Sequence, residues 1–319
     1  MPPILTLRNI SLAHINFDDF SYSVSPERKI CAGASLEKSI ARYGLLHPPI
    51  IRETDSDVYN IVAGRKRLHV MHSIHAEGTW PCMVIAQAFP EDEVFHILLA
   101  EKETSGKLSP IEKALFLQKI SAIMNDEQIA VEFLPLLDHQ PGTAAIKQTL
   151  MLLSLEKPIL LGTHRGSVNE AIARDFITLS PKDRMVLFEI ISSLRLSYSN
   201  QKKLLHICRE LACREGTNIT DLLDNNEVHG ILHHQGANPP QKTKNLMVWL
   251  SRKHMPRSGK AEKEFSRFIS SINLPQNVSV THTPYFEDDA LTLSIKFPNR
   301  KTLQHAWEKI RHTTHNSGN

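Results

Sequence analysis

The chain has 319 residues, of which 41% are apolar, and a formal net charge of +3 at pH 7. This length exceeds what one hydrophobic core usually spans, so two or three domains are expected. Apolar runs of membrane length and a secretory signal pattern are both absent from the sequence, which excludes a membrane-spanning class and predicts a soluble, cytoplasmic protein.

The N-terminal third alternates between helical and extended patterns. In chain order the sequence predicts a helix at 35–43, strands at 50–52 and 58–63, a helix at 65–76 and a strand at 82–86. Gly44 stands where a left-handed helix C-cap belongs, and Leu68, Met71 and Ile74 recur at helical spacing. This order indicates an α+β domain over residues 1–107.

The middle of the chain is helical throughout, and we assign residues 108–235 to a helical domain. Ser109-Pro110-Ile111-Glu112 combines an N-cap serine, a proline at the first helical position and a glutamate at the third, which is a strong helix start. Helices are expected at 110–124, 126–134, 143–153, 168–177, 181–194, 199–214 and 219–233. Gly236 to Pro240 then breaks the pattern and is predicted to be a linker.

Residues 241–319 are predicted to form a small C-terminal α+β domain. Expected here are helices at 242–253 and 260–272, strands at 278–282 and 290–297, and a helix at 301–312. Leu291, Leu293 and Ile295 alternate with polar residues, as in a sheet with one face in water.

This C-terminal segment is the basic part of the chain. It holds 13 Lys and Arg against 6 Asp and Glu, or +7, whereas residues 1–240 hold 24 against 28, or −4. Such a segment can contact a phosphate backbone, and the alternative is a solvated surface. The DNA-binding candidates in it are Lys242, Lys244, Arg252 and Lys253. Trp249 lies among them, and we expect it to pack in a core with Leu246 and Leu250.

A short basic motif carries the main chemical signal. The strand Ile61-Val62-Ala63 ends in Gly64, after which Arg65, Lys66 and Arg67 form the first turn of a helix. Open amides and the positive dipole end at a helix start favour an anion, and guanidinium groups can grip phosphate oxygens. The motif therefore predicts a phosphate site, and the alternative is a tight turn with solvated cations.

Several motifs in this order and spacing resemble the N-terminal domain of the ParB family. They are Ser39-Ile40, Gly44-Leu45-Leu46, Pro49-Ile50-Ile51, the strand 59–63, Gly64-Arg65-Lys66-Arg67, the strand entered through Pro81-Cys82, and Leu108-Ser109-Pro110-Ile111-Glu112-Lys113-Ala114. The resemblance covers about the first third of the chain and continues more weakly to about residue 215. It implies a fold similar to sulfiredoxin, although Arg65 replaces the cysteine that a sulfiredoxin needs after the motif glycine.

The resemblance also implies a nucleotide ligand, CTP or another nucleotide. ParB proteins bind it through a Gly-Glu-Arg-Arg motif, which here reads Gly64-Arg65-Lys66-Arg67, and through Glu-Asn-x-x-Arg, of which only Glu101 matches. Lys102 and Ser105 replace the Asn and Arg, which argues against Mg²⁺-assisted hydrolysis. We therefore expect Gly64, Arg65, Lys66, Arg67 and Glu101 to bind the nucleotide, and we assign no catalytic residue.

By the same resemblance the helical domain should contain a helix-turn-helix. The candidate pairs 126–134 with 143–153, and Thr143, Lys147 and Gln148 would contact DNA from the second helix. Few other side chains there can reach base edges, so a purely structural helical pair is the alternative.

Histidines and cysteines offer no convincing metal site. Two groups of histidines lie on predicted helices. The first is His69, His72 and His75, and the second is His229, His233 and His234. Neither group has a carboxylate spaced so that it could complete a metal site. We therefore expect these histidines to lie on exposed helix faces, and we assign no metal. The four cysteines, Cys31, Cys82, Cys208 and Cys213, are expected to be buried small hydrophobes.

Together these features predict a ParB-like DNA-associated protein, in partition or in transcriptional regulation. DNA, a ParA-like ATPase and a second copy of the chain are the expected partners. One alternative is a nucleotide-dependent nuclease or phosphotransferase using Glu101 and Glu103. Another is a protein-interaction scaffold that has lost phosphate binding.

Overall fold

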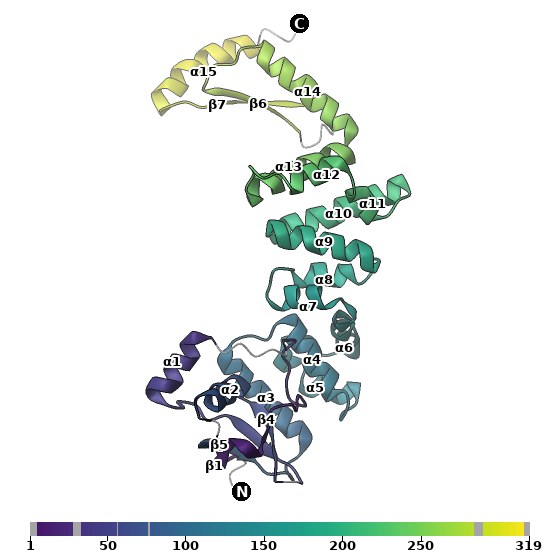
Figure 1. The fold of residues 1–319 in the computed structure, drawn as a ribbon. Helices are drawn as coiled ribbons and strands as arrows, with labels where there is room; N and C mark the ends of the chain where they lie inside the picture. The colour runs from purple at the N-terminus through teal and green to yellow at the C-terminus, as the bar shows by residue number, and fades with distance from the viewer. Residues whose placement is uncertain (1–4, 28–32, 56, 76, 284–289, 316–319) are drawn as a thin grey trace.

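The computed structural model describes residues 5–27, 33–55, 57–75, 77–283 and 290–315. Figure 1 shows a sheet with flanking helices at the N-terminal end, then a stack of helices, then a two-stranded hairpin between two long helices. The expected α+β class is therefore confirmed. Within the described residues, no helix is both long and apolar enough to cross a membrane.

The N-terminal sheet has five strands in the order β1-β5-β3-β4-β2. The strands are β1 (Leu5–Ser11), β2 (Ile15–Asn16), β3 (Ile50–Glu53), β4 (Tyr59–Ala63) and β5 (Thr79–Ile85). β3 is central and pairs antiparallel with β4 and parallel with β5. β3, β4 and β5 agree with the strands expected from sequence, whereas the edge strands β1 and β2 were not expected.

Both faces of this sheet are buried, because consecutive apolar residues of a strand point to opposite sides. On one side the core contains Ile51, Ile61 and Val84, packed against α1 (Ala34–Tyr43) and α2 (Arg65–Ile74). On the other side it contains Ile50, Val62 and Ile85, packed against residues of α3 (Glu91–Ser105), a helix that the sequence analysis missed.

The helical region begins at the predicted capping box. Ser109 Oγ accepts from the Glu112 amide, Glu112 accepts from the Ser109 amide, and Pro110 is the first helical residue. The helices are α4 (Pro110–Ile120), α5 (Asp126–Glu132), α6 (Thr143–Leu150), α7 (Lys157–His164), α8 (Glu170–Phe176), α9 (Pro181–Leu194), α10 (Tyr198–Glu215), α11 (Ile219–Leu223), α12 (Asn226–Leu232) and α13 (Pro239–His254). The predicted helix at 219–233 is thus two helices, and α7 was not predicted.

Hydrophobic packing is continuous across both expected domain boundaries. In α4, Phe116 and Leu117 belong to the sheet's core, whereas Ile111 belongs to the core of the later helices. At the second boundary, Leu246 and Leu250 of α13 are fully buried in that same later core. Residues 233–238 lie between α12 and α13 outside any helix, and α13 begins at Pro239, within the predicted linker. Independent folding of the three segments stays a prediction.

The C-terminal elements match the predicted order. They are α14 (Pro256–Ser271), β6 (Val278–His282), β7 (Leu291–Ile295) and α15 (Arg300–His315). The two strands pair antiparallel, with Val280 opposite Leu293. Leu291 and Leu293 are both exposed, so this hairpin presents apolar side chains to solvent.

Candidate phosphate-binding site

Gly64 joins β4 to α2 in a conformation that favours glycine. Its φ is +86° and its ψ is 18°, in the left-handed region. A Cβ added there would lie 2.8 Å from Pro49 Cβ, so a side chain would also clash. No side chain caps this helix start, which leaves the first-turn N–H groups of α2 for another acceptor. This end of α2 is therefore suited to an anion.

The Arg65 side chain points toward the loop that follows β2, and its guanidinium is hydrogen-bonded there. Its Nη1 donates to the Phe17 carbonyl at 2.7 Å, its Nη2 donates to the Asp19 carbonyl, and its Cζ lies 4.5 Å from the centre of the Phe20 ring. Burial lowers the pKa of this guanidinium from its ordinary value. Arg65 thus holds the loop that follows β2, in contrast to the phosphate contact expected of it.

Arg67 and Glu101, both expected at the site, lie together. Arg67 Nη2 is 2.7 Å from Glu101 Oε1, and Arg67 Nη1 donates to the His47 carbonyl at 2.6 Å. The pair connects the beginning of α2 to α3, and it holds the Arg67 guanidinium against the Gly64 turn. Lys66, between the two arginines, is exposed.

The segment after β2 crosses toward the helical region beside this site. Glu27 accepts from Arg165, at 2.9 Å from Nε and 2.7 Å from Nη2. The Arg165 hydrogen bonds lower the pKa of the Glu27 carboxyl, and the charge of Lys66 also lowers it. The Glu27–Arg165 pair thus joins the segment after β2 to the residue that follows α7.

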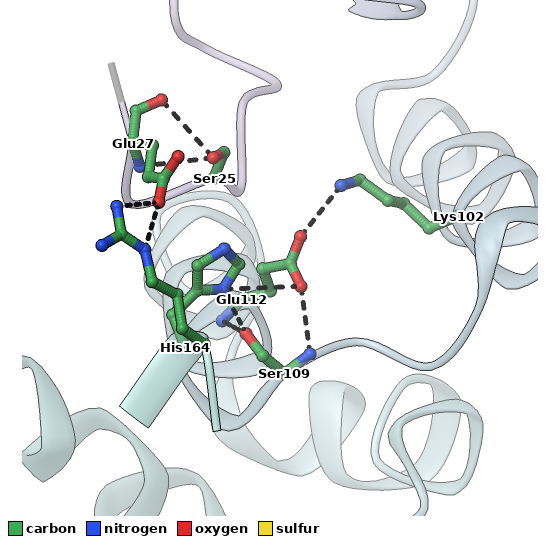
Figure 2. A network of polar contacts seen from close by, with 7 residues as sticks. Ser25, Glu27, Lys102, Ser109, Glu112 and His164 are labelled. Atoms are coloured by element: carbon green, nitrogen blue, oxygen red, sulfur yellow. Dashed lines mark hydrogen bonds and ion pairs between the residues drawn. The ribbon is translucent and has the colours of Figure 1, made fainter. Parts of the chain in front are cut away.

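Figure 2 shows how this network continues to α4. Lys102 Nζ lies 3.0 Å from Glu112 Oε1, and Ser109 Oγ lies 2.8 Å from His164 Nδ1. Burial by itself would raise the pKa of Glu112, but the Ser109 amide and Lys102 hold that pKa below its usual value. Lys102, which replaces the family's Asn, thus forms an ion pair with the capping box of α4.

Arg52, Tyr22 and Glu91 form a second, partly buried polar cluster that was not predicted from sequence. Arg52 donates to both Tyr22 and Glu91, and Tyr22 Oη donates to Glu91 Oε1 at 2.7 Å. Burial and then the hydrogen bond to Glu91 raise the pKa of Tyr22 to about 12. These residues lie 30 and 39 positions apart from Arg52, and no local motif connects them.

The helix-turn-helix candidate corresponds to α5 and α6, which are separated by a short 3-10 turn at Pro135–Leu137. On α6, Lys147 and Gln148 are exposed and Thr143 is half-buried. Arg174 Nη1 donates to the Gln148 backbone carbonyl at 3.0 Å and so joins α8 to α6. DNA binding by these residues stays a prediction.

The basic residues of α13 divide into two pairs. Lys242 Nζ donates to the Leu232 carbonyl at 2.7 Å, and Lys253 Nζ lies 3.1 Å from Glu215 Oε2. Both are thus used in contacts within the chain. Lys244 and Arg252 are exposed, and both line a groove between α10 and α13.

The cysteine prediction was correct in part. Cys82 and Cys208 are buried, and burial raises their thiol pKa values to about 11 and about 12. Cys213 is exposed, because it follows the buried Ala212 on the outer side of α10. Cys31 lies outside the described residues.

The histidine groups make ring contacts. His69 and His72 both pack edge-on against Phe17, and His229 stacks on His233 with ring centres 6.0 Å apart. His69 is half-buried, whereas the other three are exposed as expected. Among the residues that the structure describes, no group of three or more potential ligands is arranged to hold a metal ion.

Comparison with known proteins places the N-terminal domain in a family. The model of the ParB N-terminal domain matches residues 10–102. A probable chromosome 1-partitioning protein ParB of Deinococcus radiodurans is 27% identical over 172 residues, 54% of this chain and 56% of that protein. A nucleoid occlusion protein of Listeria monocytogenes serotype 4a is 26% identical over 153 residues, 47% of this chain and 50% of that protein. The chain thus spans about half the length of these curated relatives.

Solved structures are also similar. One is the C-terminally truncated chromosome-partitioning protein ParB of Caulobacter crescentus in complex with CTP-gamma-S. It has a TM-score of 0.26 and 19% identity, covering 58% of this chain and 98% of that chain. The match over residues 10–102 agrees with the motifs around Gly64, and this N-terminal region is similar to the N-terminal domain of ParB proteins.

Proposed function

We propose that this chain is a DNA-associated protein of the partition type whose N-terminal domain binds the phosphates of a nucleotide. The observation that carries the proposal is the start of α2. There Gly64 ends a buried strand in the left-handed conformation, and the first-turn amides have no side-chain cap. Such a helix start, with cations beside it, is a common phosphate-binding arrangement.

Each residue of the site has a proposed role. The first-turn N–H groups of α2 donate hydrogen bonds to the phosphate oxygens, and exposed Lys66 supplies a positive charge. Arg67 gives a guanidinium that Glu101 holds in place. Arg65 positions the loop through Phe17 and Asp19.

CTP is the first nucleotide to test, because it is the ligand of the best-understood ParB proteins. Binding without hydrolysis is proposed, since Lys102 and Ser105 replace the Asn and Arg of the second family motif. Lys102 is moreover paired with Glu112 of α4. A Mg²⁺ ion is therefore not part of the proposed site.

DNA contact is proposed for α6, with Lys147 and Gln148 as the exposed residues. Partition is the proposed role, with a ParA-like ATPase as partner and a cytoplasmic location.

A homodimer is proposed through the C-terminal segment, where Leu291, Leu293 and Trp307 are exposed apolar side chains. Burying such side chains against a second copy would remove them from water.

Calorimetric titration with CTP, ATP and GTP, with and without DNA and Mg²⁺, tests the nucleotide site. Lys66→Ala is expected to weaken binding about 5- to 20-fold, in line with loss of a charge-assisted phosphate contact. Lys38→Ala, an exposed lysine of α1, is the control and should bind as the wild type does. Absence of heat with every nucleotide would refute the site.

Gel-shift titration at graded salt tests the DNA part separately. Lys147→Ala should weaken binding and make it less dependent on salt, because one fewer counterion is released. Wild-type protein that binds no DNA at low salt would remove this half of the proposal.

A further inference from the structure

A large open groove lies between α10 and α13 in the helical stack. Its volume is 1410 Å³, and it is lined by the end of α9, the first half of α10 and the length of α13. This volume exceeds the ~300–1,000 Å³ of ordinary small-molecule pockets. It is comparable with about three turns of an α-helix, a cylinder roughly 10 Å wide and 16 Å long. The dimensions therefore suit a helical segment.

The charge of the groove is of one sign. Among the side chains that the structure describes, its lining has the cations Arg195, Lys202, Lys203, Lys244 and Arg252 and no Asp or Glu. Among the described residues, none of these side chains forms an ion pair. Glu210, outside the lining, pairs with His206 at 3.4 Å and with His254. The groove thus offers several unpaired positive charges to an acidic ligand.

Between the cations the groove is apolar and contains methionine. Leu196 and Ile207 are buried at its base, and Met247, Val248 and Met255 of the α13 side also line it. Val248 is 47% exposed, which is unusual for a valine in the middle of a helix that contributes to a core. Methionine adapts its shape to a ligand and is frequent in grooves that bind amphipathic helices.

We infer that this groove binds an acidic amphipathic helix of a partner protein. The partner's apolar stripe packs on the exposed Val248, and its carboxylates face Lys244, Arg252 and the lysines of α10. Helix-in-groove recognition uses this combination of an apolar floor and a charged rim. The inference goes beyond the proposed nucleotide and DNA sites, because it uses neither α2 nor α6.

DNA is the competing occupant, since Lys244 and Arg252 were predicted from sequence to contact it. Single strands bind on aromatic platforms, and the groove is lined by no Phe, Tyr or Trp. Duplex DNA is held mainly by hydrogen bonds and ion pairs to its phosphates, and an apolar floor provides neither. The apolar floor therefore favours a protein helix.

Fluorescence anisotropy on the full chain tests the inference with a synthetic probe. The probe is a labelled helical peptide of about 18 residues with leucine along one stripe and glutamate elsewhere. Its control is a scrambled peptide of the same composition, which keeps the charge but has no stripe. We expect the wild type to bind the probe with Kd about 10–100 µM and the scrambled peptide at least tenfold more weakly.

Two variants separate charge from apolar contact. Lys244→Glu with Arg252→Glu should weaken probe binding at least tenfold, and Val248→Ser should weaken it about threefold to tenfold. Lys182→Glu, an exposed lysine of α9 outside the groove, is the matched control and should leave binding unchanged. Circular dichroism of each variant verifies that the fold is retained.

Three outcomes would overturn the inference. One is wild-type protein that does not bind the probe at 500 µM. Another is equal binding of the striped and scrambled peptides with no effect of Val248→Ser, which would mean that charge alone acts. The third is displacement of the probe from the wild type by duplex or single-stranded DNA, together with loss of direct DNA binding in the Lys244→Glu, Arg252→Glu variant, which would make the groove a nucleic-acid site. Since Lys66 and Lys147 are intact in all variants, nucleotide and α6 binding can fail or succeed independently.

Discussion

Arg67 and Glu101 form a 2.7 Å ion pair that joins the beginning of α2 to the end of α3. The two side chains are only 19% and 30% exposed, so water screens their attraction less than it screens a surface pair. Arg67 also donates to the His47 carbonyl, which anchors the chain before β3. Arg67 thus joins the beginning of α2 to α3 and to the chain that precedes β3.

A double-mutant cycle should detect this pair as a stabilising one. For Arg67→Ala and Glu101→Ala we expect a coupling of about 0.5–1.5 kcal/mol, measured by urea unfolding. Arg8 and Glu53 form a control pair at 2.6 Å whose side chains are 45% and 28% exposed. Their coupling should be below ~0.5 kcal/mol. Equal coupling in both cycles would contradict the role given to the Arg67 pair.

Gly64 should tolerate substitution much less than another glycine of similar conformation. Gly64 and Gly166 have φ values of +86° and +76°, so alanine is strained at both. Only at Gly64 would the new Cβ lie 2.8 Å from Pro49, whereas at Gly166 it would meet nothing within 4 Å. Gly166→Ala should cost ~1–2 kcal/mol, and Gly64→Ala ~1–3 kcal/mol more.

Urea unfolding of the two glycine variants checks this difference. Circular dichroism follows the transition, and the nucleotide titration should show weaker binding for Gly64→Ala alone. A Gly64→Ala protein as stable as Gly166→Ala would show that the turn relaxes away from Pro49.

Local signals in the sequence were sufficient for most helices of the fold. Ser109 and Ser180 were identified as N-caps because capping depends on residues three positions apart, and both accept from the third helical amide. β2 could not be predicted in this way. It has two residues, and it exists only through its pairing with Tyr59 and Asn60 of β4. Tertiary pairing therefore decides such strands.

In the candidate site, too, local features could be predicted from sequence and tertiary contacts could not. Gly64 was predicted from the end of a strand meeting the beginning of a helix, and the role of Glu101 followed from the family resemblance. The direction of Arg65 could not be read from sequence, because it depends on the backbone carbonyls of Phe17 and Asp19, more than forty residues earlier. The core that Leu246 joins could not be read from sequence either, because α13 packs against α10 and no local pattern reports a contact between distant helices.

Asp183 should make stability depend on pH in the acid range. Burial would raise its pKa, but hydrogen bonds from Thr220 N and Oγ1, both at 2.8 Å, and from Ser180 hold the pKa below the ordinary value. A carboxyl with a lowered folded-state pKa stabilises the fold above its unfolded pKa of about 4 and loses this contribution as pH falls further. The contribution is therefore complete at neutral pH.

Asp183→Asn tests this dependence. We expect it to lower stability by ~1–3 kcal/mol at pH 7, with the difference from wild type shrinking below about pH 4. Asp221→Asn is the matched control, because Asp221 is exposed and occupies the same third position in α11. Urea unfolding between pH 3 and 7 gives both curves, and a pH-independent difference for Asp183→Asn would contradict the prediction.

Cys213 should be the reactive thiol of the described part of the chain. It is exposed, whereas Cys82 and Cys208 are buried and have raised thiol pKa values, so their thiolates are scarce at neutral pH. In a Cys31→Ser background, Ellman's reagent should label one thiol rapidly in the native protein and all three in urea. Cys213→Ser in that background should abolish the rapid phase, and its persistence would show that α10 or β5 opens.

Leu293 should be required for association of two copies through the C-terminal hairpin. Leu291 and Leu293 are 49% and 59% exposed on the same face of β7, and Trp307 of α15 is 57% exposed. Leu293→Asp places a charge on this face and should weaken the dimer at least tenfold, about 1.4 kcal/mol or more. Thr292→Asp is the control, since Thr292 is exposed on the opposite face of the same strand. Sedimentation equilibrium measures both, and equal association of the two variants would place any dimer contact elsewhere, because only Leu293→Asp disturbs the apolar face.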